Sequence, residues 1–132
     1  MLDTDTVSCV VCGKTPALDA RLASVPKKQL CISAVTRGEL LFGLNLKDGA
    51  QRLAQVVDQF LQRVQCLAWG EEAATHFAHV AAAMHKAGSP VGSTDEMVAG
   101  HAIAAGAVLV TNNGRHFSRV AGLNIENWTQ DH

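Results

Sequence analysis

The segment that decides the fold class runs from Ser93 to Thr111 and reads STDEMVAGHAIAAGAVLVT. Its first part, Ser93–Ala105, is rich in alanine and is predicted to form a helix. This helix opens with a capping-box pattern, in which Ser93 is the expected N-cap and Glu96 stands three residues later. The apolar run Ala107–Thr111 that follows is the best strand in the chain. The segment therefore reads as a helix that leads into a buried strand.

The same alternation of helix and strand extends outward on both sides of this segment. Short strands are predicted at Met1–Asp3, Gln29–Ser33, Gln65–Ala68 and Leu123–Ile125. Helices are predicted at residues 4–12, Ala17–Val25, Ala34–Leu46, 48–64 and Glu71–Ala87, of which 48–64 has the clearest amphipathic spacing. Short strands alternating with helices predict an α/β fold with a largely parallel sheet.

Composition bounds the class of protein. The 132 residues are expected to form a single domain over 1–132, and 48% hydrophobic with 17% charged residues excludes disorder. Eleven basic and twelve acidic residues give a net charge of −1, which excludes the general basic field of many nucleic-acid binders. No apolar run is long enough for a membrane span, and MLDTDTV lacks a secretory pattern. We therefore expect a cytoplasmic protein with reduced cysteines and no membrane contact.

Acidic residues fall where strands end. Asp3 and Asp5 follow the first strand, Glu39 lies on the helix after Gln29–Ser33, and Asp95 opens the Ser93 helix. The carboxyl ends of parallel strands meet at one edge of a sheet, so several of these acids are expected to meet there. Clustered carboxylates repel one another, and oxygen ligands favour Mg²⁺ or Mn²⁺. The pattern thus predicts metal-assisted hydrolysis of a phosphodiester.

Taken singly, three of these acids also have a structural interpretation. Asp95 would favour a helix N-terminus electrostatically, and Asp5 would serve as an N-cap. Glu39, beside Leu40 and other apolar residues, would lie on a solvent-facing side. Asp3 has few structural uses, because a charge inside the first strand of the chain has little to pair with.

Four blocks of sequence carry a resemblance to a known family. They are MLDTD at 1–5, CISAVTRGELLFG at 31–43, PVGSTDEMVAGHA at 90–102 and VLVTNNGRHF at 108–117. In this order and spacing they resemble the PIN-domain endoribonucleases, and among these the VapC-type toxins of toxin–antitoxin pairs. The resemblance covers nearly the whole chain. It implies a three-layer α/β/α domain with a central, mostly parallel sheet.

The resemblance also implies site residues. It makes Asp3, Glu39 and Asp95 the catalytic acids that hold Mg²⁺ or Mn²⁺, directly or through water, and places Asn113 at the fourth catalytic position. Four further residues are accessory candidates: Thr4, Asp5, Thr111 and His116. Two of these depart from the family pattern, since Asp5 stands where asparagine is usual and His116 stands where an acid commonly precedes the phenylalanine. These departures bear on whether one metal ion binds or two.

The implied function is that of a toxic endoribonuclease that halts translation. The sequences of the last two blocks are most similar to those of members that cut the anticodon loop of the initiator tRNA, so a tRNA is the expected substrate. Individual basic side chains would bind the RNA. Arg37 and Arg115 are the principal candidates, and Lys27, Lys28 and Arg119 are further ones. Because the chain has no tyrosine and few aromatic residues, we expect no base-stacking platform.

The resemblance implies partners as well. Such toxins form homodimers and are neutralised by a cognate VapB-type antitoxin in a larger hetero-oligomer. Operator DNA would be bound only through the antitoxin.

Four alternatives remain open from the sequence. Asp3-Thr4-Asp5 also matches the start of haloacid-dehalogenase-like phosphatases, although only Met1 and Leu2 precede it. The chain could also be an inactive module that only binds an antitoxin. Cys9 and Cys12 have the spacing of half a zinc site, and His76 and His79 share a helical face with Glu72. We favour small core residues as the interpretation of the two cysteines, and a stripe of surface residues as the interpretation of the two histidines.

Overall fold

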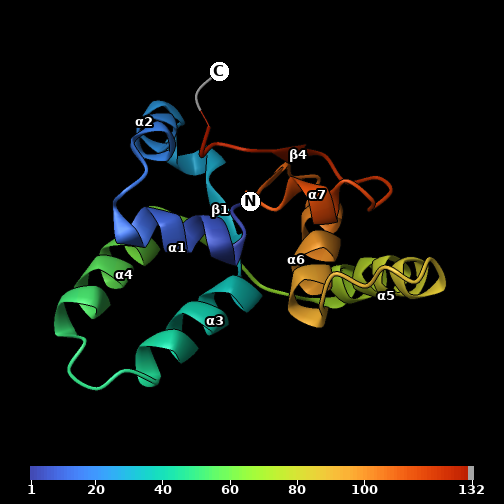
Figure 1. Cartoon of the computed structure of the whole chain (residues 1–132), viewed down its shortest axis with the longest axis horizontal. Helices are drawn as coiled ribbons and strands as arrows, with labels where there is room; N and C mark the ends of the chain where they lie inside the picture. The colour runs from blue at the N-terminus through green and yellow to red at the C-terminus, as the bar shows by residue number, and fades with distance from the viewer. Residues whose placement is uncertain (131–132) are drawn as a thin grey trace.

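The computed structural model describes residues 1–130 of the chain and shows the predicted alternation (Figure 1). Its helices are α1 Thr4–Cys12, α2 Pro16–Ser24, the 3₁₀ helix η1 Lys27–Gln29, α3 Ala34–Asn45, α4 Gln51–Arg63, α5 Glu71–Lys86, α6 Ser93–Ala104 and α7 Gly114–Phe117. Its strands are β1 Cys31–Ser33, β2 Gln65–Leu67, β3 Leu109–Val110 and β4 Ile125–Glu126. The two shortest helices, η1 and α7, were not predicted.

The N-terminal segment joins two pairs of parallel strands. β1 pairs with β2, and β3 pairs with β4, both in parallel. Leu2 forms a parallel bridge to Val110, and its N–H donates to the carbonyl of Cys31 at 3.0 Å. The order across the sheet is therefore β2, β1, the Leu2 segment, β3, β4. This arrangement places Asp3, the next residue, at the centre of the carboxyl edge.

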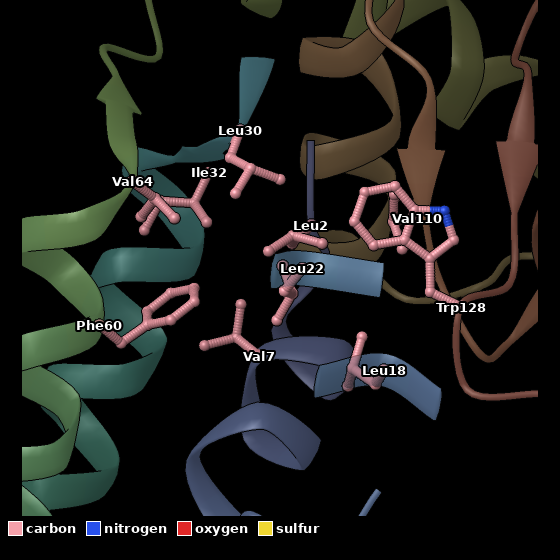
Figure 2. Close-up of a cluster of buried hydrophobic side chains, with 10 residues drawn as sticks. All are labelled: Leu2, Val7, Leu18, Leu22, Leu30, Ile32, Phe60, Val64, Val110 and Trp128. Carbon is pink, nitrogen blue, oxygen red and sulfur yellow. The ribbon is translucent and has the colours of Figure 1, made fainter. Parts of the chain in front are cut away.

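Alternate side chains of the strands enter two hydrophobic cores on opposite faces of the sheet. Leu2, Ile32 and Val110 pack with Val7 of α1, Leu18 and Leu22 of α2 and Phe60 of α4 (Figure 2). Met1 and Leu109 pack instead with Val80 and Met84 of α5, Val98, Ala99 and Ala102 of α6, and Phe117 of α7. Figure 1 shows these two groups of helices on either side of the strands. The three-layer α/β/α architecture is confirmed.

The start of α6 differs from the predicted capping box. The N-cap is Gly92, with a φ of 109°, and no side chain caps the helix. Glycine reaches this positive φ without the strain that a Cβ would cause, so the chain turns into the helix one residue earlier than predicted. The Glu96 carboxylate accepts from the N–H of Val91 at 3.3 Å instead of closing a box with Ser93.

None of the helices within residues 1–130 combines the length and the apolar character that crossing a membrane requires.

Candidate active site

Asp3 combines a buried position with a structural role. Its side chain is 2% exposed, it is the N-cap of α1, and its Oδ1 accepts from the Thr6 N–H at 2.9 Å. The expectation that this charge has few structural uses was therefore wrong. Asp5, considered above as an N-cap, lies instead in the first turn of α1 and is exposed.

A chain of hydroxyl groups holds Glu39. The Thr4 Oγ1 lies 2.5 Å from Glu39 Oε1 and 3.3 Å from the Oγ1 of buried Thr36. A hydroxyl has one proton to donate, so Thr4 donates to the carboxylate and accepts from Thr36. Thr36 and Glu39 are three residues apart on α3 and share one face of that helix. The side chain of Glu39 is thereby turned toward the start of α1.

Asp95 lies in the first turn of α6 and is half-buried. Burial raises its pKa to about 6, and repulsion from the carboxylates of Asp5, Asp3 and Glu39 adds to the rise. The nearby His116 side chain lowers the pKa of Asp95 and offsets part of this rise. The structure thus brings the predicted acids from α1, α3 and α6 within electrostatic reach of one another, and it brings His116 to the same place.

The pKa of Asp3 is raised as well. Burial raises its pKa, and the nearby Asp5 carboxylate adds a smaller rise. Hydrogen bonds from Thr111 and Thr6 to the Asp3 carboxylate offset part of this effect, since they favour its charged form. Thr111 is 1% exposed and directly follows β3, so it also belongs to the carboxyl edge of the sheet.

Asn113 contacts the residue that departs from the family pattern. Its Nδ2 donates to Asp5 Oδ2 at 2.5 Å, and its backbone N–H donates to Thr111 Oγ1 at 2.9 Å. The amide of Asn113 therefore orients Asp5 in this structure, rather than Asp3 or Asp95. This pairing follows from the tight turn after β3, which sequence spacing alone does not define.

The candidate RNA-binding cations separate into two groups. Arg37 on α3 and Arg115 on α7 are exposed, and both helices leave the carboxyl edge of the sheet. Lys27 and Lys28 lie in η1, which precedes β1, and so belong to the opposite ends of the strands. Arg119 borders a cavity of about 550 Å³ beside α5, away from the acids. Of these five candidates, Arg37 and Arg115 are therefore the two that lie on helices leaving the acidic edge of the sheet.

The donor set of the site suits a hard divalent cation. The acids of the site offer only oxygen ligands, and the one ion pair within residues 1–130, Arg21–Glu126, lies elsewhere. Within residues 1–130, no three or more histidine, cysteine, aspartate or glutamate side chains are grouped closely enough to hold a metal ion by themselves. Mg²⁺ usually binds to one or two carboxylates and keeps several waters, so an open site of this kind fits it. Asp3, Glu39 and Asp95 are the residues that could hold the ion.

The cysteine pair and the histidine pair considered as alternative metal sites lie in different parts of the molecule. Cys9 is half-buried against the first core, whereas Cys12 is exposed, so the core interpretation holds only for Cys9. Burial raises the pKa of the Cys9 thiol. His76 and His79 touch edge to face with ring centroids 6.3 Å apart and line the cavity beside α5.

Sequence reasoning assigned no role to three buried hydroxyl groups near the strand ends. Thr6 and Thr36 are fully buried, and the Thr6 hydroxyl donates to the carbonyl of Val110 at 3.2 Å. Ser33, also fully buried, caps α3 by accepting from the Val35 N–H at 3.1 Å. The signal that could have found them is their position, since each lies within a turn of a predicted strand end.

Comparison with known proteins places this site in a family. Residues 1–123 match the PIN domain. The chain is 36% identical over 129 residues to the tRNA(fMet)-specific endonuclease VapC of Shigella flexneri, covering 98% of this chain and 97% of that protein. The protein of the same name from Salmonella typhimurium strain LT2 is 37% identical over 128 residues, covering 97% and 96%. A crystal structure of DNA-bound VapBC from Salmonella typhimurium superposes with a TM-score of 0.91 at 37% identity, covering 97% and 96%. The chain therefore belongs to the PIN domain family.

Proposed function

We propose that this protein is the toxin of a VapC-type toxin–antitoxin pair and cuts a tRNA with the help of Mg²⁺ or Mn²⁺. The observation that carries the proposal is the group of carboxylates at the carboxyl edge of the sheet, with Asp95 at a pKa of about 6 and no cation paired to them within residues 1–130. The initiator tRNA is the first substrate to test, because two relatives with more than a third of their residues identical are named for it.

Each site residue has a task in this proposal. Asp3 and Asp95 hold the cation, and Glu39 holds it directly or through a water, with Thr4 fixing the direction of the Glu39 carboxylate. A bound divalent cation supplies an activated water and offsets the charge of the phosphoryl oxygens. Asn113 orients the neighbouring Asp5 carboxylate, which adds negative charge beside the cation.

Recognition of RNA would rest on a few local charges. The net charge of −1 provides no general attraction, so in this proposal the exposed Arg37 and Arg115 contact phosphates of the RNA backbone. The PIN domain match removes the haloacid-dehalogenase alternative.

An exposed apolar surface supports an antitoxin partner. Phe42 on α3 and Leu46 at its C-cap are 65% and 69% exposed, and Leu41 beside Phe42 is also exposed. A groove of about 210 Å³ between α1, α3 and α4 begins next to them, and Thr4, Glu39 and Lys47 line it. A cognate VapB-type antitoxin that covered this surface would also cover the site. The homodimer and the binding of operator DNA through the antitoxin belong to the same proposal, in line with the DNA-bound VapBC neighbour.

The proposal is tested by incubating the purified, antitoxin-free protein with total tRNA in Mg²⁺, in Mn²⁺ and in EDTA. We expect one discrete fragment with either metal and none with EDTA. Asp95→Asn should lose the activity, whereas Asp19→Asn, the same change at an exposed acid of α2, should keep it.

The rival to exclude is the inactive antitoxin-binding module. A folded protein that binds antitoxin, binds no Mn²⁺ and cuts no RNA under any condition would establish that rival and end the nuclease proposal. A fragment that forms equally well with Asp95→Asn would place the chemistry elsewhere.

A further inference from the structure

A buried hydrogen bond joins α6 to the end of β1. His101 Nδ1 lies 2.7 Å from Ser33 Oγ, and the two residues are 4% and 0% exposed. Within residues 1–130 it is the one side-chain hydrogen bond between α6 and the junction of β1 with α3. Nothing in the site described above requires it, since neither residue is one of the clustered acids.

The partners of Ser33 leave its hydroxyl proton available for this bond. Its Oγ accepts from the Val35 N–H at 3.1 Å, which caps α3, and its own proton is then free to donate to His101 Nδ1. Burial lowers the pKa of His101 and so favours the neutral ring, which can accept this bond at Nδ1 when its proton is on Nε2. One hydroxyl thus caps α3 and ties it to α6.

Each residue of this bond is separated from a site acid by the same number of residues along the chain. Ser33 precedes Glu39 by six residues on α3, and His101 follows Asp95 by six residues on α6. Six residues correspond to about 9 Å along a helix. α3 and α6 also pack against each other. The bond therefore pins the two helices together at a point set back from both carboxylates.

The α6 end of the bond is itself held firmly. A Cβ added to Gly100, the residue before His101, would come within 2.5 Å of the Phe77 backbone nitrogen on α5. Such close backbone packing leaves α6 little freedom to shift on α5. The negative charges of Glu39 and Asp95 repel each other and act to drive α3 and α6 apart. A tie between these helices opposes that force.

We propose that His101 is a positioning residue, which through Ser33 sets the separation of Glu39 on α3 from Asp95 on α6. The proposal rests on the proposed function, because it matters only if these two acids serve one cation. It deepens that function by adding a residue that touches neither metal nor RNA.

The test compares three variants with the wild-type protein. His101→Leu removes the acceptor, and His101→Asn restores one near the position of Nδ1. Trp69→Phe is the matched control, because it removes a different side-chain hydrogen bond that reaches α6 from a distant segment, from Trp69 Nε1 to the Met97 carbonyl at 3.0 Å. Each protein is measured for Mn²⁺ affinity, for kcat and KM of tRNA cleavage, and, without metal, for amide exchange over residues 33–40.

For His101→Leu we expect about 10-fold weaker Mn²⁺ binding and a kcat lower by about 10-fold, with little change in KM. Faster amide exchange at the start of α3 should accompany this loss. His101→Asn should recover most of all three quantities, and Trp69→Phe should leave them near wild type.

The proposal is overturned if amide exchange at the start of α3 is as slow in His101→Leu as in the wild type. It is also overturned if His101→Asn and Trp69→Phe lose as much Mn²⁺ affinity and kcat as His101→Leu does. The exchange measurement needs neither metal nor RNA. If the wild-type protein failed to bind Mn²⁺ or cut RNA, the proposed function would fall, while exchange would still decide whether His101 holds α3.

Discussion

Two clusters of charged side chains lie in this molecule, and their charges are balanced differently. Between α2 and β4, Arg21 pairs with Glu126 at 3.2 Å and lies 5.1 Å from the centre of the Trp128 ring, whose Nε1 also donates to Glu126. At the carboxyl edge, Asp3, Asp5, Glu39 and Asp95 share one region, and no described side chain forms an ion pair with them.

Under the proposed function, this difference separates charges that serve the fold from charges that would serve a bound cation. The α2–β4 cluster satisfies its own charges and needs nothing further. The acidic site keeps carboxylates close together and raises the pKa of Asp3 and Asp95, which costs stability in the free protein. Such a cost is typical of functional sites, where a cation that binds would offset it.

The largest expected effect is the loss of cleavage when Asp3 is neutralised. Asp3→Asn should lower the single-turnover rate of tRNA cleavage by about 100-fold or more, because a metal ligand contributes several kcal/mol to transition-state stabilisation. Asparagine caps helices as well as aspartate does, so urea unfolding should show little loss of stability. Asp3→Ala should lose the same activity and in addition about 1 kcal/mol of stability. A rate for Asp3→Asn within about threefold of wild type would contradict the role of this carboxylate.

A smaller effect is expected when the support of Glu39 is removed. Thr4→Val keeps the shape of the side chain but removes the hydroxyl that donates to Glu39, so cleavage should slow by about 10-fold. Thr4→Ser should restore most of the rate. Thr75→Val is the control, because the Thr75 hydroxyl bonds only to the Glu71 carbonyl on the exposed part of α5. Equal rates for Thr4→Val and Thr75→Val would show that the Thr4 bond has no catalytic use.

The imbalance of charge should also appear as a dependence of stability on pH. The pKa of Asp95 is about 6 in the folded protein, against 3.8 as its ordinary value, so its contribution to stability is present below pH 4 and is lost as the pH rises through 6. Asp95→Asn should therefore match the wild type near pH 4 and exceed it at pH 7 in metal-free buffer. The gain should be about 1 kcal/mol, since solvent screens this half-buried group.

Urea unfolding of both proteins across this pH range measures the effect. The lowered pKa of His101 contributes equally to both proteins and cancels in the difference. A wild-type protein as stable as Asp95→Asn at pH 7 without metal would show that the acids do not strain the fold.

The smallest effect is expected in the balanced cluster. Glu126→Gln removes the ion pair with Arg21, whose side chains are 45% and 49% exposed, and should cost no more than about 0.5 kcal/mol. The cost should shrink in high salt, and tRNA cleavage should not change. Thermal unfolding at low and high salt checks this, and a loss of cleavage would show that the two clusters are coupled.

Local patterns predicted most of the elements and the acids of the site. Helical spacing of apolar residues located α4 within a few residues, because burial on one face follows the period of the helix. The alanine content of Ser93–Ala105 located α6. Positions at a strand end and at a helix start drew attention to Asp3 and Asp95, and the family resemblance assigned these two residues and Glu39 as the catalytic acids. The structure brings them together, as parallel strands predict.

Contacts between distant segments could not be predicted in this way. The bridge of Leu2 to Val110, the bond from Thr4 to Glu39 and the pair of Asn113 with Asp5 each join residues far apart in the sequence. The capping box at Ser93 failed because the φ of Gly92 moves the helix start by one residue. η1 and α7, with three and four residues, are too short to show a period.

The most direct test of the account is whether the acidic site binds a divalent cation. Mn²⁺ is titrated into metal-free wild-type protein at pH 7 and into Asp95→Asn, with free Mn²⁺ followed by electron paramagnetic resonance. We predict saturable binding by the wild type and binding weaker by at least about 10-fold in Asp95→Asn. A wild-type protein that binds no Mn²⁺, or a variant that binds it equally well, would contradict the claim that these carboxylates are assembled for a metal.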